Sequence, residues 1–199
     1  MSDPKIDSGK RTWIIASGCA GAVGVGFAAV PFVGSFQPSE RARAAGAAVE
    51  ADISALKPGE KMTVEWRGKP VWIIRRTPEQ LAELPKVDGL LADPKSARKP
   101  DELTPLYARN EGRSIKPEVL VVVGICSHLG CSPSDKFTPG AQPSLPDTWA
   151  GGFLCPCHGS TFDMAGRVYK NKPAPDNLEV PPHMYVSDTR LIIGEDKKA

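Results

Sequence analysis

Two six-residue segments constrain this chain more than any other feature, because their side chains offer one set of metal ligands from two distant places. Residues 126–131 read Cys-Ser-His-Leu-Gly-Cys, and residues 155–160 read Cys-Pro-Cys-His-Gly-Ser. Together they hold four of the five cysteines and two of the three histidines. Thiolates and imidazoles bind zinc, copper and iron–sulfur centres, and these residue types alone do not choose among the metals. The fold therefore has to bring two loops together.

Each segment also has a cysteine to spare. If the first cysteine and the histidine of each segment bind a metal, Cys131 remains in the first segment and Cys157 in the second. One spare thiol in each loop suggests a disulfide that clamps the two loops together. Such a bond requires an oxidising compartment.

The two segments resemble the paired boxes of the Rieske family almost residue for residue. In that family, two histidines replace two cysteines on one iron of a 2Fe-2S cluster. The resemblance implies one Rieske-type 2Fe-2S cluster with four ligands: Cys126 and Cys155 on one iron, and His128 and His158 on the other.

The same resemblance implies roles for the residues around the ligands. Cys131 and Cys157 correspond to the family's disulfide, and Ser160 corresponds to a hydroxyl that donates a hydrogen bond to the cluster. A structural Cys2His2 zinc site is the alternative. That alternative gives no role to the extra cysteine pair or to Gly159-Ser160.

The N-terminal part contains a long uncharged run. No charged side chain occurs from Thr12 to Ser39, and residues 13–36 are apolar or small. About 20 apolar residues suffice to cross a membrane, so we predict a cytoplasmic N-terminus over 1–11 and a transmembrane anchor over 12–36. A cleaved signal peptide is the alternative, although the run is longer than the core of 7–15 residues that such peptides carry.

Lys10-Arg11, directly before the run, resembles a twin-arginine export signal in a Lys-Arg form. A basic flank also favours the cytoplasmic side of the membrane. We therefore expect a single-pass protein of a bacterial inner membrane, with its main domain on the periplasmic side.

Residues 37–50 are small and polar, and we interpret them as a linker to a head domain over 51–199. The resemblance implies that this head is an all-β antiparallel sandwich with a small cluster-binding subdomain over about 125–182, and that the linker is a hinge. Pro is about twice as frequent as average, which favours short strands and fixed loops.

Local patterns predict several elements of the head. They are a hairpin of 61–66 and 70–75, a short helix capped by Thr77, buried strands at 119–125 and 152–154, and a last hairpin of 185–187 and 191–193. Residues 85–117 lack periodicity and are expected to form a long surface excursion. His183 is expected in a loop or on the surface.

The anchor, the linker and the clamped boxes together resemble the Rieske subunits of quinol–cytochrome c oxidoreductases, the cytochrome bc complexes of respiratory chains. The resemblance implies that His158 hydrogen-bonds ubiquinol and receives its proton. It also implies that Leu129 and Gly130 form a tip that docks on a cytochrome b subunit, that the head then moves to a c-type cytochrome subunit, and that the complex is dimeric.

Other functions compete with this interpretation. The small Rieske subunit of a periplasmic molybdenum oxidase, of the arsenite-oxidase type, also carries an exported disulfide-bearing domain. A dioxygenase-type ferredoxin lacks the spare cysteine pair and the anchor. Nucleic acid is not an expected partner, because the net charge is only +2 and no basic stripe is present.

Two positions depart from the family pattern. Phe162 stands where high-potential members usually place a tyrosine that donates to a ligand sulfur, so we expect a somewhat lower reduction potential. Lys172 stands where the family's Gly-Pro-Ala-Pro loop usually begins with glycine.

Overall fold

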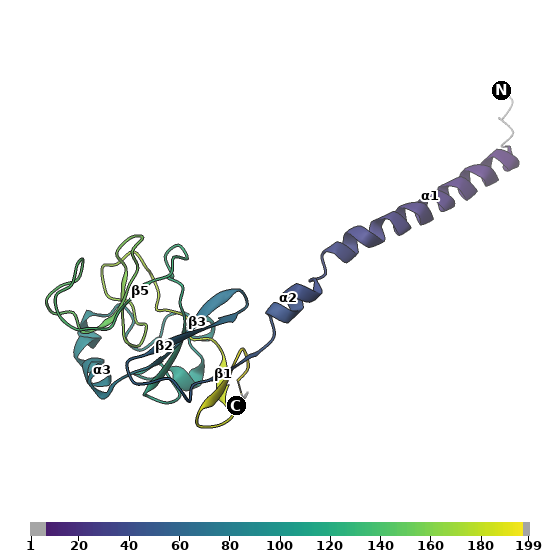
Figure 1. The fold of residues 1–199 in the computed structure, drawn as a ribbon. Helices are drawn as coiled ribbons and strands as arrows, with labels where there is room; N and C mark the ends of the chain where they lie inside the picture. The colour runs from purple at the N-terminus through teal and green to yellow at the C-terminus, as the bar shows by residue number, and fades with distance from the viewer. Residues whose placement is uncertain (1–6, 197–199) are drawn as a thin grey trace. The chain divides into compact units, whose positions relative to one another are not determined.

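The computed structural model describes residues 7–196, apart from the side chains of five residues between 41 and 101. It consists of two compact units that divide between Ala44 and Ala45. The helical segments are α1 (Ser8–Ser35), α2 (Glu40–Ala45), α3 (Pro78–Glu83), η1 (Pro85–Leu90), α4 (Pro100–Leu103) and η2 (Leu106–Ala108) (Figure 1). The strands are β1 (Val49–Asp52), β2 (Lys61–Trp66), β3 (Lys69–Arg75), β4 (Val119–Val123), β5 (Ser134–Lys136), β6 (Gly152–Leu154), β7 (Thr161–Asp163), β8 (His183–Tyr185) and β9 (Arg190–Ile193).

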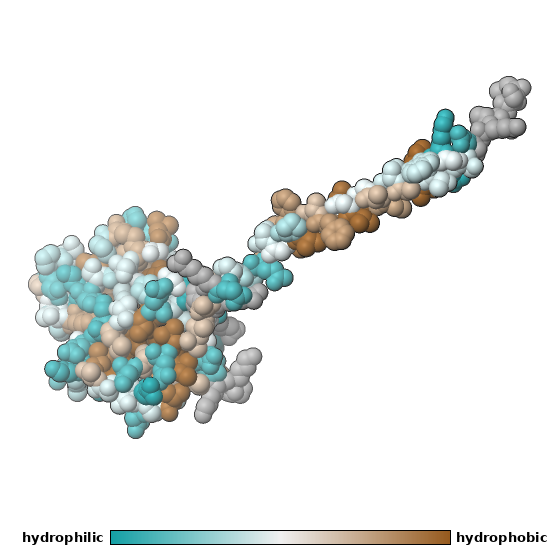
Figure 2. Space-filling view, turned by 45° about the vertical axis from the view of Figure 1, so that its right-hand side comes forward, coloured by the Kyte–Doolittle hydropathy of each residue, from teal (hydrophilic) through white to brown (hydrophobic). Residues whose placement is uncertain are grey.

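Helix α1 contains most of the uncharged run from Thr12 to Ser39. Its N-cap is Asp7, whose carboxylate accepts hydrogen bonds from the backbone N–H groups of Gly9 and Lys10. At about 1.5 Å per residue, its 28 residues exceed the roughly 30 Å of a membrane's hydrocarbon core. Figure 2 shows apolar side chains along its surface. The helix is long and apolar enough to cross a membrane by length and composition.

The segment after α1 is partly ordered. Ser39 places its hydroxyl oxygen 3.2 Å from the backbone nitrogen of Ala42, which caps the short helix α2. Alanine and arginine are strong helix formers, which explains a helix in this small-residue segment. Strand β1 begins at Val49, so it takes its first two residues from the stretch assigned to the linker.

The central sheet has the order β2-β3-β4 and is antiparallel. The predicted hairpin of β2 and β3 is confirmed, and it turns over Arg67 and Gly68. Both of these residues have positive φ, as a two-residue turn of type I′ requires. Strand β4 is buried along its whole length, which confirms the predicted buried strand over most of 119–125.

This sheet separates two apolar cores, because neighbouring side chains of a strand point to opposite faces. Trp72 and Ile74 of β3 lie in the larger core, and Val71 and Ile73 lie in the second. The sheet β1-β9-β8 contributes Leu191 and Ile193 to the second core, and the sheet β5-β6-β7 contributes Phe153 and Phe162 to the first. The head is thus mostly β, in three antiparallel layers.

The helix at Thr77 has the predicted capping box: Gln80 N–H donates to the Thr77 hydroxyl, and Thr77 N–H donates to the Gln80 side chain. The closing hairpin is also present, with its strands shifted slightly to β8 and β9. His183, however, is only 1% exposed and lies in β8. The expectation of a surface histidine was wrong, because the ring packs edge-on against Tyr107 at 5.6 Å, and Nδ1 lies 2.8 Å from the Pro181 carbonyl oxygen.

The prediction that residues 85–117 form a surface excursion was also wrong in part. Val87, Leu91 and Ala108 are buried, and Arg113 is fully buried. The Arg113 guanidinium donates to four oxygens: the carbonyls of Ala165, Gly166 and Leu178, and the hydroxyl of Thr104. A charged residue is buried here because chain carbonyls replace its water.

Candidate metal centre

The two cysteine- and histidine-bearing loops have the same backbone construction. In the first loop, Cys126 N–H donates to the Cys131 carbonyl at 2.8 Å. In the second, Cys155 N–H donates to the Ser160 carbonyl at 2.7 Å. Each bond closes a six-residue loop at the end of a strand, because Cys126 follows β4 and Cys155 follows β6.

A glycine occupies the fifth position of both loops. Gly130 and Gly159 have φ of 80° and 73°, a left-handed conformation that glycine adopts without strain. Their N–H groups donate back to the carbonyls of the first residues, Cys126 and Cys155, at 3.1 and 3.0 Å. The glycines in the two boxes are therefore required by the loop geometry.

The first cysteine of each loop points inward. Cys126 and Cys155 are each 2% exposed, and neither forms a disulfide. Burial raises the pKa of the Cys126 thiol, and the adjacent Cys155 thiol adds to the rise. The His128 backbone N–H and the Ser160 hydroxyl act in the opposite direction and lower this pKa. Two buried sulfurs thus lie side by side between the loops.

The two histidines lie on the outer side. The ring centroids of His128 and His158 are 4.7 Å apart, with the ring planes at 84°. His158 is exposed and His128 is half-buried. The sequence-predicted ligand set is therefore present as a buried pair of cysteines and a pair of imidazoles farther out, with one of each from each loop.

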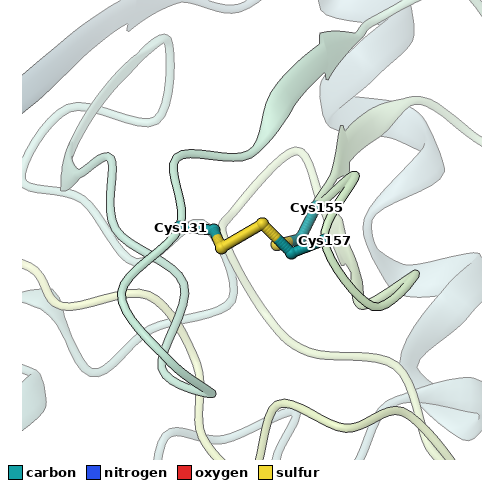
Figure 3. A group of neighbouring side chains, drawn as sticks. All are labelled: Cys131, Cys155 and Cys157. Atoms are coloured by element: carbon teal, nitrogen blue, oxygen red, sulfur yellow. A yellow bond between two sulfur atoms is a disulfide. The ribbon is translucent and has the colours of Figure 1, made fainter.

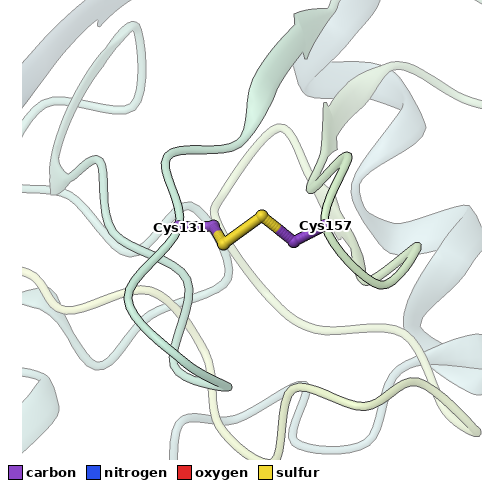
Figure 4. The surroundings of a disulfide bond; sticks show 2 residues. All are labelled: Cys131 and Cys157. Carbon is purple, nitrogen blue, oxygen red and sulfur yellow. A yellow bond between two sulfur atoms is a disulfide. The ribbon is translucent and has the colours of Figure 1, made fainter.

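Cys131 and Cys157 form a disulfide across the two loops (Figure 4). Cys155 lies beside this bond (Figure 3), and the sulfur atoms of the three cysteines are all within 4.8 Å of one another. Proximity alone would make these three sulfurs a metal-binding group. Two of them are bonded to each other, however, so only Cys155 retains a thiol to offer.

A third segment covers the loops through two serines. Ser160 is fully buried, and its hydroxyl oxygen accepts a hydrogen bond from Ala174 N–H at 3.0 Å. Ser127 donates to the Asp176 carbonyl at 2.6 Å, and its hydroxyl oxygen accepts from Asp176 N–H at 3.2 Å. Sequence reasoning identified Ser160 but missed Ser127, whose only signal was its place inside the first box.

Leu129 and Phe162 have opposite surroundings. Leu129 is 71% exposed, and Gly130 beside it is also exposed. Phe162 is fully buried in β7, where it faces Phe153 of β6. The first loop thus has an exposed apolar tip, and Phe162 is buried beside Phe153 in the sheet that follows the loops.

The donor set fits a positively charged centre held by two thiolates and two imidazoles. Ionising both buried thiols would place two like charges side by side, a cost that a bound polycation removes. Such a set suits a Rieske 2Fe-2S cluster, and by residue type alone it also suits zinc. Among the described residues, the disulfide of Cys131 and Cys157 is the feature that has no role in a zinc site.

Comparison with known proteins distinguishes the 2Fe-2S cluster from zinc. Residues 47–182 match the family model described as "Rieske [2Fe-2S] domain". Residues 13–39 match a second model, described as "Ubiquitinol-cytochrome C reductase Fe-S subunit TAT signal". That second match begins after Lys10-Arg11.

Two bacterial relatives carry the same name. A ubiquinol-cytochrome c reductase iron-sulfur subunit from Allochromatium vinosum is 55% identical over 191 residues, covering 94% of this chain and 89% of the relative. The subunit of the same name from Rhodospirillum rubrum is 39% identical and covers 97% and 96%. A chain of a hyperthermophilic respiratory Complex III is 28% identical, with a TM-score of 0.44 and coverage of 89% and 97%.

Proposed function

The chain belongs to the Rieske [2Fe-2S] family of ubiquinol–cytochrome c reductase iron–sulfur subunits, and from this membership we propose that it carries electrons from ubiquinol to a c-type cytochrome. The observation that supports the proposal most is the division of the four side chains. Two sulfurs are buried and two imidazoles face outward, 4.7 Å apart. A cluster held this way is insulated on one side and open to a substrate on the other.

The proposed ligands are Cys126 and Cys155 on the inner iron, and His128 and His158 on the outer iron. When bound, the 2Fe-2S cluster supplies a one-electron acceptor of raised potential, because neutral imidazoles replace two thiolates. The chain's own part is to hold the two loops in register. The disulfide of Cys131 and Cys157 does this.

His158 is the proposed contact for quinol, since it is the more exposed of the two imidazoles. A ring nitrogen that is not bound to metal can accept a hydrogen bond from the quinol hydroxyl and then the proton itself. Quinol oxidation needs an electron acceptor and a proton acceptor, because a quinol releases protons as well as electrons.

Leu129 and Gly130 are the proposed docking tip toward a cytochrome b subunit, supported by the exposure of an apolar side chain beside His128. The second proposed partner is the c-type cytochrome subunit of the same complex, which we propose is dimeric. Helix α1 would anchor the chain in a bacterial inner membrane, and the linker would leave the periplasmic head able to move between partners.

The test is the composition of the detergent-extracted assembly. We expect two irons and two acid-labile sulfides per chain, with haem b and haem c in the same particle. A colourless protein containing one zinc per chain would refute the electron-transfer function. Molybdenum in place of the two haems would instead support the small subunit of a molybdenum oxidase.

A further inference from the structure

Two hollows lie side by side on the flank of the head, and they share a wall. The wall is Tyr169, Lys170, Asn171 and Lys172. The first hollow has a volume of about 340 Å³ and includes Arg98 and Pro175 in its lining. The second has a volume of about 290 Å³.

The first hollow is positively charged without local compensation. Arg98, Lys170 and Lys172 line it, and no carboxylate lines either hollow within the described chain. Arg98 donates to the Pro175 carbonyl and Lys170 to the Gly89 carbonyl, each at 2.8 Å, so both meet neutral oxygens. Lys172 is exposed and makes no ion pair with the side chains that the structure describes. Three cations therefore face one hollow.

The two carboxylates nearest in sequence to the lining of the first hollow, Asp93 and Asp176, are already committed. Asp93 is buried and accepts hydrogen bonds from the backbone N–H groups of Ala97 and Arg98. Asp176 pairs with Lys99 at 2.8 Å. Neither is free to neutralise the hollow, so the charge remains available to an anion from outside.

The walls are built from hydrogen-bonded backbone. Lys170 N–H donates to the Leu90 carbonyl, and Ala92 N–H donates to the Val168 carbonyl, both at 2.9 Å. On the other side, Pro175 follows Ala174, whose N–H binds the Ser160 hydroxyl. The hollow is thus a preformed surface on the outside of the loop that covers the candidate metal centre.

The second hollow is more apolar. Leu90 lines it and is 54% exposed, and Trp149 and Tyr169, whose ring centroids are 5.6 Å apart, line it as well. A cationic hollow next to an apolar one matches the mixture of charged rim and apolar anchor found in protein interfaces. A free inorganic anion would use only the first hollow.

We propose that this double hollow, hereafter the flank site, docks an acidic segment of the c-type cytochrome subunit. A carboxylate of the partner would sit among Arg98, Lys170 and Lys172, and an apolar side chain next to it would lie on Leu90 and Trp149. The inference rests on the proposed function, since the first hollow is lined by Ala174 and Pro175 of the loop that covers the proposed cluster site.

The test uses a water-soluble carbodiimide on the detergent-extracted complex, because this reagent joins a lysine amine directly to a carboxylate in contact. We expect Lys172 or Lys170 to be linked to an aspartate or glutamate of the c-type cytochrome subunit. High ionic strength should abolish the link by screening the contact. Lys172→Arg should remove the Lys172 link while retaining the charge.

Kinetics provide the second measurement. Lys172→Gln should slow haem c reduction by this subunit about two- to tenfold at low ionic strength, and the difference should vanish at high ionic strength. Lys57→Gln is the matched control, because Lys57 is exposed and lines neither hollow. That variant should behave as the unmodified complex does.

Several outcomes would overturn the flank site. One is carbodiimide links at other lysines but none at Lys170 or Lys172. Another is protection of Lys172 from acetylation by phosphatidylglycerol micelles without any partner link, which would make a lipid the occupant. If the cluster and both haems are present and Lys172→Gln is silent, only this inference fails. If they are absent, the proposed function fails first.

Discussion

Ser160 makes two interactions through one hydroxyl. It accepts a hydrogen bond from Ala174 N–H, and it lowers the pKa of the Cys126 thiol, as a donor to that sulfur would. A donor at a ligand sulfur stabilises the more negative, reduced cluster and so raises its potential. Such a bond contributes about 1.5–3 kcal/mol in total, and only the difference between redox states counts.

We therefore expect Ser160→Ala to lower the midpoint potential. About 1 kcal/mol of difference corresponds to roughly 40 mV for one electron. Phe162→Tyr, which adds a hydroxyl in the next strand, should shift the potential upward. Protein-film voltammetry on the full chain measures both. An unchanged potential in Ser160→Ala would mean that the hydroxyl serves only to hold Ala174.

His183 makes stability depend on pH. Burial lowers the pKa of its imidazole below the ordinary 6.5, opposed by the Pro181 carbonyl and Asp196. The unfolded chain therefore binds a proton at a higher pH than the folded chain does. The free energy of unfolding should fall as pH drops below about 6.5, by at most about 1.4 kcal/mol per pH unit.

His183→Phe should remove this part of the pH dependence, while retaining a ring against Tyr107. Urea unfolding between about pH 5 and about pH 8, monitored by tryptophan fluorescence, gives the slope of the unfolding free energy against pH for each protein. The comparison uses slopes because the substitution itself changes stability. Equal slopes in the two proteins would show that the folded chain also protonates His183 over this range.

At the scale of elements, the disulfide holds two loops that have no strand pairing with each other. Cys131 and Cys157 are 26 residues apart in sequence. In the chain-entropy account, closing such a loop stabilises the fold by about 3 kcal/mol. Cys157→Ser should lower unfolding stability by that order and increase amide exchange in both loops. Cys19→Ser, in the exposed face of α1, is the control and should change neither. Unaltered exchange in the variant would mean that the backbone bonds suffice.

Arg113 joins the 100–117 region to the loop after β7. Its removal would leave the carbonyls of Ala165, Gly166 and Leu178 buried without that donor. We expect Arg113→Leu to destabilise the head by about 3–5 kcal/mol. Arg113→Lys should also destabilise it, because an ammonium lacks the planar fork of donors.

The matched control for Arg113 is Arg190, which is 57% exposed and pairs with Glu50 at 2.8 Å. Arg190→Leu should cost less than about 1 kcal/mol, as exposed ion pairs do. Chemical unfolding of these three variants and of the unmodified protein measures the change in unfolding free energy. Similar losses at both arginines would contradict the role given to burial.

At the scale of the whole molecule, the head carries its own core. The three apolar clusters of the described chain contain no residue before Val49. Removing residues 1–44 should therefore leave the head folded, with its unfolding free energy changed by less than about 0.5 kcal/mol. The shortened chain should no longer need detergent. A lower melting temperature or loss of the cluster spectrum would show that the first unit stabilises the second.

The sequence by itself determined the features whose causes are local. The turn at Arg67-Gly68, the capping box at Thr77 and the uncharged run of α1 depend on residues within one or two turns of chain, so pattern reasoning finds them. The two boxes also name their ligand types directly. The binding of metal by Cys126, His128, Cys155 and His158 remains a proposal that their geometry supports.

Only the tertiary structure decided which polar side chains are buried. Arg113 meets Ala165 across 52 residues, and Ser127 meets Asp176 across 49. A local sequence pattern does not show partners so far away in the chain. Residues 85–117 and His183 were therefore predicted to be exposed. The physical reason is that burying a polar group is tolerated only where hydrogen-bonding partners replace water. Here those partners come from distant parts of the chain, and folding alone brings them together.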